Sequence, residues 1–163
     1  PMQLKSVSQA QHPFAAILSC ADSRVPPEII FDEGIGDIFD IRIPGNIATL
    51  EVIGSLEYAV EVLGTRLIMM LGHERCGAVI AAVKREKLPG HISSFVTFVQ
   101  PALANVKSKS GDSIDNAVVA NVKYQMEQIK KNSTLINAKL SSKQLKIVCS
   151  RYDLDTGEVR ILA

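Results

Sequence analysis

The chain has 163 residues, a formal net charge of +1 and 47% hydrophobic residues. This length suits one domain with a substantial core, so we expect a single domain over residues 1–163. Interspersed charges without a dense basic stripe argue against a nucleic-acid partner, and no apolar run is long enough to span a membrane.

Apolar runs and helical periodicity predict the elements of the first half of the chain. The continuous apolar run 15–19 predicts a buried parallel strand, and 38–41 predicts a second strand. From Thr49 to Leu63, apolar residues recur at helical spacing, which predicts a helix. Thr49 is suited to cap its start, and Gly64 follows its end.

The second half continues the alternation of strands and helices and closes with a hairpin. The helix 112–131 carries one apolar stripe, which we interpret as core packing without functional meaning. The turn sequence Asp155-Thr-Gly157 predicts the closing hairpin at the sheet edge. In chain order, the predicted elements are strand 66–71, helix 76–88 ended by Pro89-Gly90, polar loop 107–111, helix 112–131, strand 145–149 and hairpin strands 151–154 and 158–162.

This alternation predicts an α/β fold with a mostly parallel central β-sheet flanked by α-helices. Cys20 directly follows the first predicted strand, and His73 follows the third. Ligands of open α/β sheets bind outside the carboxyl ends of the strands. We therefore expect residues that lie far apart in the sequence to meet at this edge.

Two short motifs carry the candidate metal ligands: Cys20-Ala-Asp22-Ser-Arg24 and His73-Glu-Arg-Cys76-Gly77. Two thiols and one imidazole are a set that catalytic Zn²⁺ uses when its fourth position is left for water. A redox pair is less favoured because there is no Cys-x-x-Cys, and a Cys–His nucleophilic dyad would leave the second cysteine without a role. With two thiolates the site is formally neutral, which keeps the zinc Lewis acidic.

Asp22 and Arg24 are candidates for an orienting pair. A guanidinium grips a carboxylate through two hydrogen bonds, lowers its pKa and fixes its direction. Such a carboxylate accepts a hydrogen bond from zinc-bound hydroxide; released from Arg24, it is able to bind the metal and close the site. The alternative is an ordinary surface ion pair of little energetic consequence. The position beside Cys20 favours the orienting role.

The three cysteines also bear on the compartment. Cys20 and Cys76 lie in the metal motifs, and we interpret Cys149 as a small buried apolar residue. An odd number of cysteines and an N-terminus without a visible signal peptide predict a reducing compartment, so we expect a cytoplasmic protein.

These motifs resemble those of β-class carbonic anhydrases. The similarity covers roughly Gln11 to the C-terminus and rests on Cys20-Ala-Asp-Ser-Arg-Val-Pro-Pro-Glu28, Gly45-Asn46, Glu57-Tyr58-Ala59-Val60, Gly72-His-Glu-Arg-Cys-Gly-Ala-Val79 and Tyr152-Asp-Leu-Asp-Thr-Gly157. The resemblance implies that Cys20, His73 and Cys76 are the zinc ligands. It also implies that Asp22 and Arg24 are the orienting pair.

The resemblance further implies the reversible hydration of CO₂ to bicarbonate and a proton. Zinc-bound hydroxide, oriented by Asp22, is expected to attack CO₂ in an apolar pocket formed by Phe39 and Tyr58, with Gln11 hydrogen-bonded to the substrate. In the family this pocket lies at a subunit boundary, so a dimer or higher oligomer is expected. No proton shuttle is assigned; His12 and His91 are candidates only as histidines, the residue type suited to proton transfer near neutral pH.

The sequence departs from the family pattern in several places. Only ten residues precede Gln11, so residues 1–10 correspond to a remnant of a usually longer arm. At Ile43-Pro44 and at Cys149, members of the family usually carry smaller residues. Some bacterial members of the family build a non-catalytic bicarbonate site around a tryptophan, and this chain has no tryptophan. We therefore expect an open site, in which the fourth position of the zinc is left for water.

Two alternatives remain open from the sequence. A hydrolase of carbon disulfide or carbonyl sulfide on the same scaffold would carry the same zinc motifs, and parallel CO₂ and CS₂ assays distinguish the two. A non-catalytic assembly module would usually lose a ligand or the orienting pair, whereas all five residues are present here. Zinc stoichiometry tests that alternative.

Overall fold

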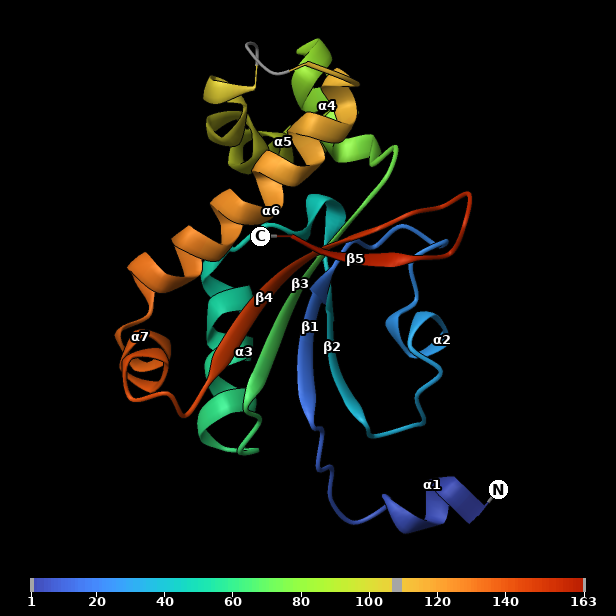
Figure 1. Cartoon of the computed structure of the whole chain (residues 1–163), viewed down its shortest axis with the longest axis vertical. Helices are drawn as coiled ribbons and strands as arrows, with labels where there is room; N and C mark the ends of the chain where they lie inside the picture. The colour runs from blue at the N-terminus through green and yellow to red at the C-terminus, as the bar shows by residue number, and fades with distance from the viewer. Residues whose placement is uncertain (1, 107–109, 163) are drawn as a thin grey trace.

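The computed structural model describes residues 2–106 and 110–162 of the chain, which form a twisted β-sheet with helices packed around it (Figure 1). The five-stranded sheet has the order β2-β1-β3-β4-β5; β1 to β4 are parallel, and β5 runs antiparallel to β4. The strands are β1 Ala15–Ser19, β2 Ile38–Arg42, β3 Leu67–His73, β4 Lys146–Tyr152 and β5 Val159–Leu162. The fold is thus the predicted α/β class.

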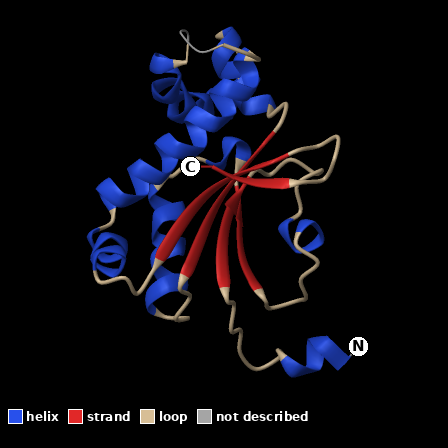
Figure 2. Ribbon diagram, in the orientation of Figure 1, coloured by secondary structure: helices blue, strands red, loops and turns tan. Residues whose placement is uncertain are grey.

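Helices connect the strands and gather beyond their carboxyl ends, where α4 and α5 lie (Figure 2). The helix α1 lies apart from the body, beyond the opposite ends of the strands (Figure 1). The α-helices are α1 Met2–Ser6, α2 Pro27–Ile30, α3 Leu50–Glu61, α4 Gly77–Lys84, α5 Ser93–Val99, α6 Ser113–Asn132 and α7 Thr134–Ser141. Short 3₁₀ turns are η1 Pro44–Asn46, η2 Gly90–Ile92 and η3 Gln100–Asn105.

Side-chain caps explain where three of the helices begin. Thr49 accepts from the Val52 N–H and starts α3. Asp112 accepts from two backbone N–H groups at the start of α6, and Ser133 accepts from one at the start of α7. Each of these bonds satisfies a helix-end donor that otherwise lacks a partner.

The sheet separates two apolar layers. On one face, Ala16 and Leu18 of β1 and Ile68 and Met70 of β3 pack against the buried sides of α3, α6 and α7. The other face forms a smaller cluster around Ile17, and the short α2 adds Ile30 to it. Because both faces of β1 and β3 are packed, a one-residue slip would move every side chain to the wrong layer. The register at the site is therefore strongly specified.

A third apolar cluster lies beyond the carboxyl ends of the strands and surrounds both motif cysteines. It combines α4, α5, α6 and the segment that follows β2. Gly72 allows α6 to approach β3 closely, because a Cβ there would lie 2.4 Å from a Val122 methyl carbon. None of the described helices combines the length and the apolar character that a bilayer crossing requires.

Several predicted boundaries are wrong by a few residues, for identifiable reasons. The helix predicted over 76–88 ends at Lys84, because Arg85 adopts a left-handed conformation with φ 53°. Strand β3 extends through His73, and β4 runs unbroken through Tyr152, so 151–154 is not a separate strand. The hairpin itself is confirmed, since β5 pairs with the end of β4.

Short helices outside the predicted set are α1, α2, α5 and α7 with the 3₁₀ turns. Their segments are too short, or too rich in β-branched and aromatic residues, to give a clear helical period. Residues 107–109 of the predicted polar loop lie outside the described part of the chain.

Asp40 on β2 gives the fold a testable dependence on pH. Its Oδ1 atom is buried without a hydrogen-bond partner among the described residues. Burial, with a smaller contribution from the charge of Glu28, raises the pKa of Asp40 to about 6 from 3.8. A raised carboxyl pKa means that the folded state binds the proton more tightly, so stability falls as the pH rises from about 4 through about 6.

We predict that Asp40→Asn removes this penalty. The expected gain at pH 8 is about 1–2 kcal/mol for this partly buried carboxyl, or roughly 3–6 °C in Tm, with a smaller gain at pH 4.5. Thermal unfolding of both proteins with a metal chelator measures this, with the exposed Asp32→Asn as control. An equal gain at both pH values would contradict the assignment.

Candidate metal centre

Three potential metal ligands converge at the carboxyl edge of the sheet. Cys20 directly follows β1, His73 is the last residue of β3, and Cys76 is the residue before α4. Their donor atoms lie within 4.8 Å of one another, and all three side chains are buried. Because β1 and β3 are parallel neighbours, with Leu18 opposite Met70, their ends deliver Cys20 and His73 to one point.

The geometry of this group fits a tetrahedral metal with two sulfur ligands. The sulfur atoms of Cys20 and Cys76 are 3.9 Å apart. Two thiolates bound to zinc at about 2.3 Å with a tetrahedral angle lie about 3.8 Å apart. His73 Nε2 is buried and has no hydrogen-bond partner among the described residues, as expected of an atom reserved for a metal.

The tautomer of His73 is set by the backbone of the next residue. Its Nδ1 atom lies 2.7 Å from the Glu74 carbonyl oxygen, which only accepts, so Nδ1 carries the proton. The lone pair of Nε2 is then free to face the two sulfur atoms. This is the arrangement that most metal-binding histidines adopt.

The Sγ atoms of Cys20 and Cys76 lie within hydrogen-bond distance of each other. A hydrogen bond from Cys76 lowers the pKa of Cys20, against the effect of burial. The same hydrogen bond, together with burial, raises the pKa of Cys76. The Gly45 N–H also donates to Cys20 Sγ, at 3.4 Å, which favours the thiolate. Burial and the hydrogen bond between the two groups disfavour a thiolate at Cys76. A bound dication would offset this, because it stabilises both thiolates.

Asp22 and Arg24 form the predicted pair directly beside this group. Arg24 Nε donates to Asp22 Oδ1 at 2.9 Å and Nη2 donates to Oδ2 at 2.8 Å, while the Arg24 backbone N–H donates to Oδ1 at 3.0 Å. These bonds lower the pKa of Asp22 well below its usual value. Asp22 Oδ2 lies 3.9 Å from His73 Nε2, so the carboxylate faces the ligand atoms.

Comparison with known proteins identifies the family. Residues 15–159 match the family model of carbonic anhydrase. The chain is 36% identical over 160 residues to a carbonic anhydrase of Mycolicibacterium smegmatis, covering 96% of this chain and 78% of that protein. It is 37% identical over 155 residues to carbonic anhydrase 2 of Mycobacterium tuberculosis, covering 93% and 75%.

A solved structure specifies the class. The fold matches that of a Coccomyxa β-carbonic anhydrase in complex with acetazolamide, with a TM-score of 0.89 and 29% identity, covering 99% of this chain and 77% of that one. The chain belongs to the β-class of carbonic anhydrases. As a carbonic anhydrase, it acts on CO₂ and bicarbonate.

In this carbonic anhydrase, the residues expected to form the substrate pocket lie away from the candidate metal ligands of the same chain. Gln11 and Tyr58 line one hollow of about 380 Å³, and the rings of Phe39 and Tyr58 have centroids 6.1 Å apart. Gln11 precedes β1 whereas Cys20 follows it, and a strand of five residues is about 16 Å long. Within one subunit the two groups therefore lie at opposite ends of β1.

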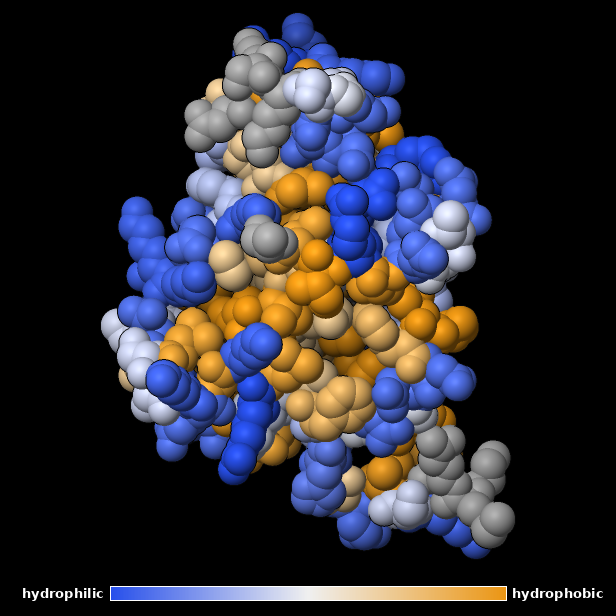
Figure 3. All heavy atoms as spheres, in the orientation of Figure 1, coloured by the Kyte–Doolittle hydropathy of each residue, from blue (hydrophilic) through white to orange (hydrophobic). Residues whose placement is uncertain are grey.

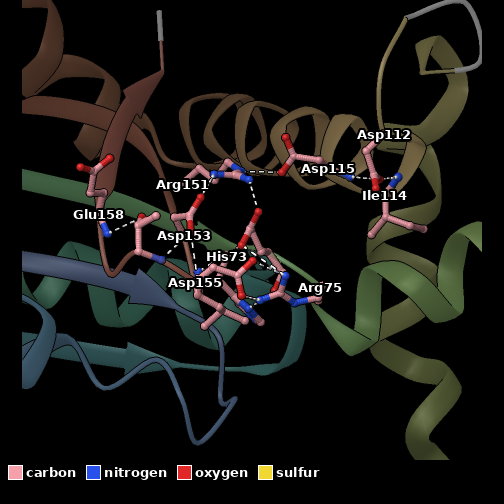
Figure 4. Close-up of polar contacts among 12 residues, drawn as sticks. His73, Arg75, Asp112, Ile114, Asp115, Arg151, Asp153, Asp155 and Glu158 are labelled. Carbon is pink, nitrogen blue, oxygen red and sulfur yellow. Dashed lines mark hydrogen bonds and ion pairs between the residues drawn. The ribbon is translucent and has the colours of Figure 1, made fainter.

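A charged network holds the turn between His73 and Cys76. Arg151 on β4 donates to Glu74 in this turn, to Asp115 on α6 and to Asp153, and its side chain is only 12% exposed (Figure 4). The second Glu74 carboxylate oxygen accepts from the Leu154 N–H at 3.1 Å. The turn that joins two candidate ligands is thus fixed to the β4–β5 connection.

Sequence reasoning missed several residues that support the carbonic anhydrase site. Arg42 Nε donates to the Cys20 carbonyl oxygen at 3.1 Å, and its Nη2 donates to that of Asp22. Gly45 supplies the N–H to sulfur, and Glu74 supplies the carbonyl to His73. The side-chain types in the sequence give no sign of these contacts, because each of them uses a backbone atom of a neighbouring segment or residue.

We predict that Arg151→Met weakens both the fold and the candidate metal site. The change removes the guanidinium partner of three partly buried carboxylates, at an expected cost of about 2–4 kcal/mol, or roughly 5–15 °C in Tm. Added zinc should transfer to a chelator faster than from the wild type. The matched control is Arg66→Met, an exposed arginine before β3. If the two variants lose metal at the same rate, Arg151 does not support the site.

Proposed function

We propose that this carbonic anhydrase hydrates CO₂ at a zinc ion held by Cys20, His73 and Cys76. The observation that carries the proposal is the convergence of two sulfur atoms and an unpartnered Nε2 atom beside the Asp22–Arg24 pair. A zinc ion bound there would act as a Lewis acid and lower the pKa of a bound water, which makes hydroxide available near neutral pH.

The Asp22 carboxylate orients the reacting water. Its lowered pKa keeps it ionised at neutral pH, so both of its oxygens only accept hydrogen bonds. Oδ1 accepts from the Arg24 Nε and backbone N–H groups, and Oδ2 accepts from Nη2. Oδ2 faces the ligand atoms and has a further lone pair for the hydrogen of the reacting hydroxyl group. This acceptor turns an oxygen lone pair towards CO₂.

We further propose that two subunits assemble each substrate pocket. Gln11, Phe39 and Tyr58 are too far from Cys20 in one chain, so they would serve the metal centre of a partner. Large apolar side chains are exposed around their hollow, among them Tyr58 and Val62. A broad apolar patch also lies in the middle of the face seen in Figure 3. Such surfaces are typical of subunit interfaces.

We propose that residues 1–163 act as one domain. Two apolar clusters lie on the two faces of the central sheet, and α6 contributes both to one of these and to the third cluster beyond the carboxyl ends of the strands. All three cysteines are free and buried, which is compatible with the proposed reducing compartment.

We predict that Asp22→Asn retains about one zinc per chain but lowers kcat/KM for CO₂ hydration roughly 10²- to 10³-fold, the usual effect of losing one oriented hydrogen bond in an active site. Stopped-flow hydration assays and metal analysis measure the two effects. The control Asp32→Asn, on the exposed α2–β2 connection, should be fully active.

The companion variant Cys76→Ala separates metal binding from orientation. It should lose both zinc and activity, because only one thiol and one imidazole remain. Full activity in Asp22→Asn would exclude the orienting role, and tight zinc binding by Cys76→Ala would show that the ligand set is wrong.

A mixing experiment tests the shared pocket. Asp22→Asn and Gln11→Ala should each have low activity as pure proteins. In a co-expressed mixed dimer, one site combines the intact Asp22 of one chain with the intact Gln11 of the other. Random pairing should then restore about a quarter of wild-type activity. A mixture whose activity equals the mean of its parents would place Gln11 outside the partner's site.

A further inference from the structure

The turn 44–48, between β2 and α3, brings a backbone donor to the candidate metal centre. Its Gly45 N–H donates to Cys20 Sγ at 3.4 Å. Gly45 has φ +75°, and a Cβ there would lie 3.2 Å from carbon atoms of Ala78 and Val99. The turn therefore packs tightly against the elements around the ligand. Since a hydrogen bond weakens quickly with distance and angle, its strength depends on how firmly the turn is held.

Two buried amide side chains of α6 hold this turn. Asn121 Nδ2 donates to the Gly45 carbonyl oxygen at 2.8 Å, and Gln125 Oε1 accepts from the Ala48 N–H at 2.9 Å. Gln125 Nε2 donates to Asn121 Oδ1 and to the Phe98 carbonyl oxygen, each at 3.0 Å. Asn121 and Gln125 are 1% and 0% exposed. They are four residues apart and therefore neighbours on the helix surface.

The orientation of both amides is fixed by these bonds. The four oxygen and nitrogen atoms of the two side chains each have a partner in the turn, in α5 or in the other amide. Flipping either amide would place a donor against a donor or an acceptor against an acceptor. The pair therefore sets the position of the turn at both of its ends.

Core packing alone does not account for two amides at these positions. Other inward positions of α6 are apolar, including Val118, Val122 and Ile129. A buried amide is costly unless every polar atom is paired, and apolar residues of similar size would fill the same space. What only the amides supply is a fixed attachment between α6 and the turn.

We propose that Asn121 and Gln125 are positioning residues of the metal centre. They hold the 44–48 turn so that the Gly45 N–H points at Cys20 Sγ. This hydrogen bond withdraws charge from the sulfur and limits its electron donation to a bound metal. The inference rests on the proposed function, because it requires Cys20 to be a metal ligand.

The test uses the protein with Co²⁺ in place of zinc, because cobalt reports its sulfur ligands through a thiolate-to-metal charge-transfer band. In Asn121→Leu the sulfur would donate more charge, so the band should shift to lower energy. Co²⁺ transfer to a chelator should become roughly three- to tenfold faster, because a Cys20 thiolate that lacks the Gly45 N–H donor is protonated more readily; this is the change expected for one lost hydrogen bond. The control Ile129→Val removes one buried methyl from the same helix; it should lower Tm but leave the band and the transfer rate unchanged.

A second variant keeps the proposal testable if Asn121→Leu does not fold. Gln125→Met removes the bond to Ala48 and the bond that orients Asn121, so it should shift the band in the same direction by a smaller amount. Unchanged bands in the folded variants, or an equal shift in Ile129→Val, would overturn the positioning role alone. Failure of the wild-type protein to bind about one Co²⁺ per chain would instead overturn the proposed metal site.

Discussion

The parallel pairing of β1 with β3 brings the candidate metal ligands together. Cys20 and His73 lie 53 positions apart in the sequence, and only adjacent strands that end at the same edge bring them together. The apolar side chains on both faces of these strands fix the register, since a slip by one residue would exchange the two faces. Cys76 completes the group because α4 begins at the same edge.

Around this edge, neighbouring segments control the direction of each ligand. The Glu74 carbonyl selects the tautomer of His73, and the Gly45 N–H contacts the sulfur of Cys20. The helix α6 connects to both sides of the centre: its N-terminal turn contributes Asp115 to the Arg151 network, and its middle contributes the amides that contact the 44–48 turn. A helix that serves mainly as core packing is thus also bonded to the 44–48 turn beside Cys20 and, through Arg151, to the turn between His73 and Cys76.

The sequence was sufficient to predict the fold class, all five strands of the sheet and the helices α3, α4 and α6, because each of these elements has a clear apolar pattern, a capping residue or a turn signal. It also predicted the convergence of Cys20, His73 and Cys76 with Asp22 and Arg24, because strand ends determine where motifs meet. It did not predict the contacts of Arg42, Gly45 or Arg151, which depend on tertiary distances. The sequence does offer one sign of Asn121 and Gln125, because they are two amides four residues apart within an apolar stripe.

X-ray absorption at the zinc edge of the purified protein tests whether Cys20, His73 and Cys76 hold a zinc ion. We predict two sulfur neighbours at about 2.3 Å and two nitrogen or oxygen neighbours at about 2.0–2.1 Å. In Cys76→Ala, any zinc that remains should have one sulfur neighbour. A shell with more than two sulfurs, a shell with none, or no zinc in a folded protein would show that these three residues do not form the metal site.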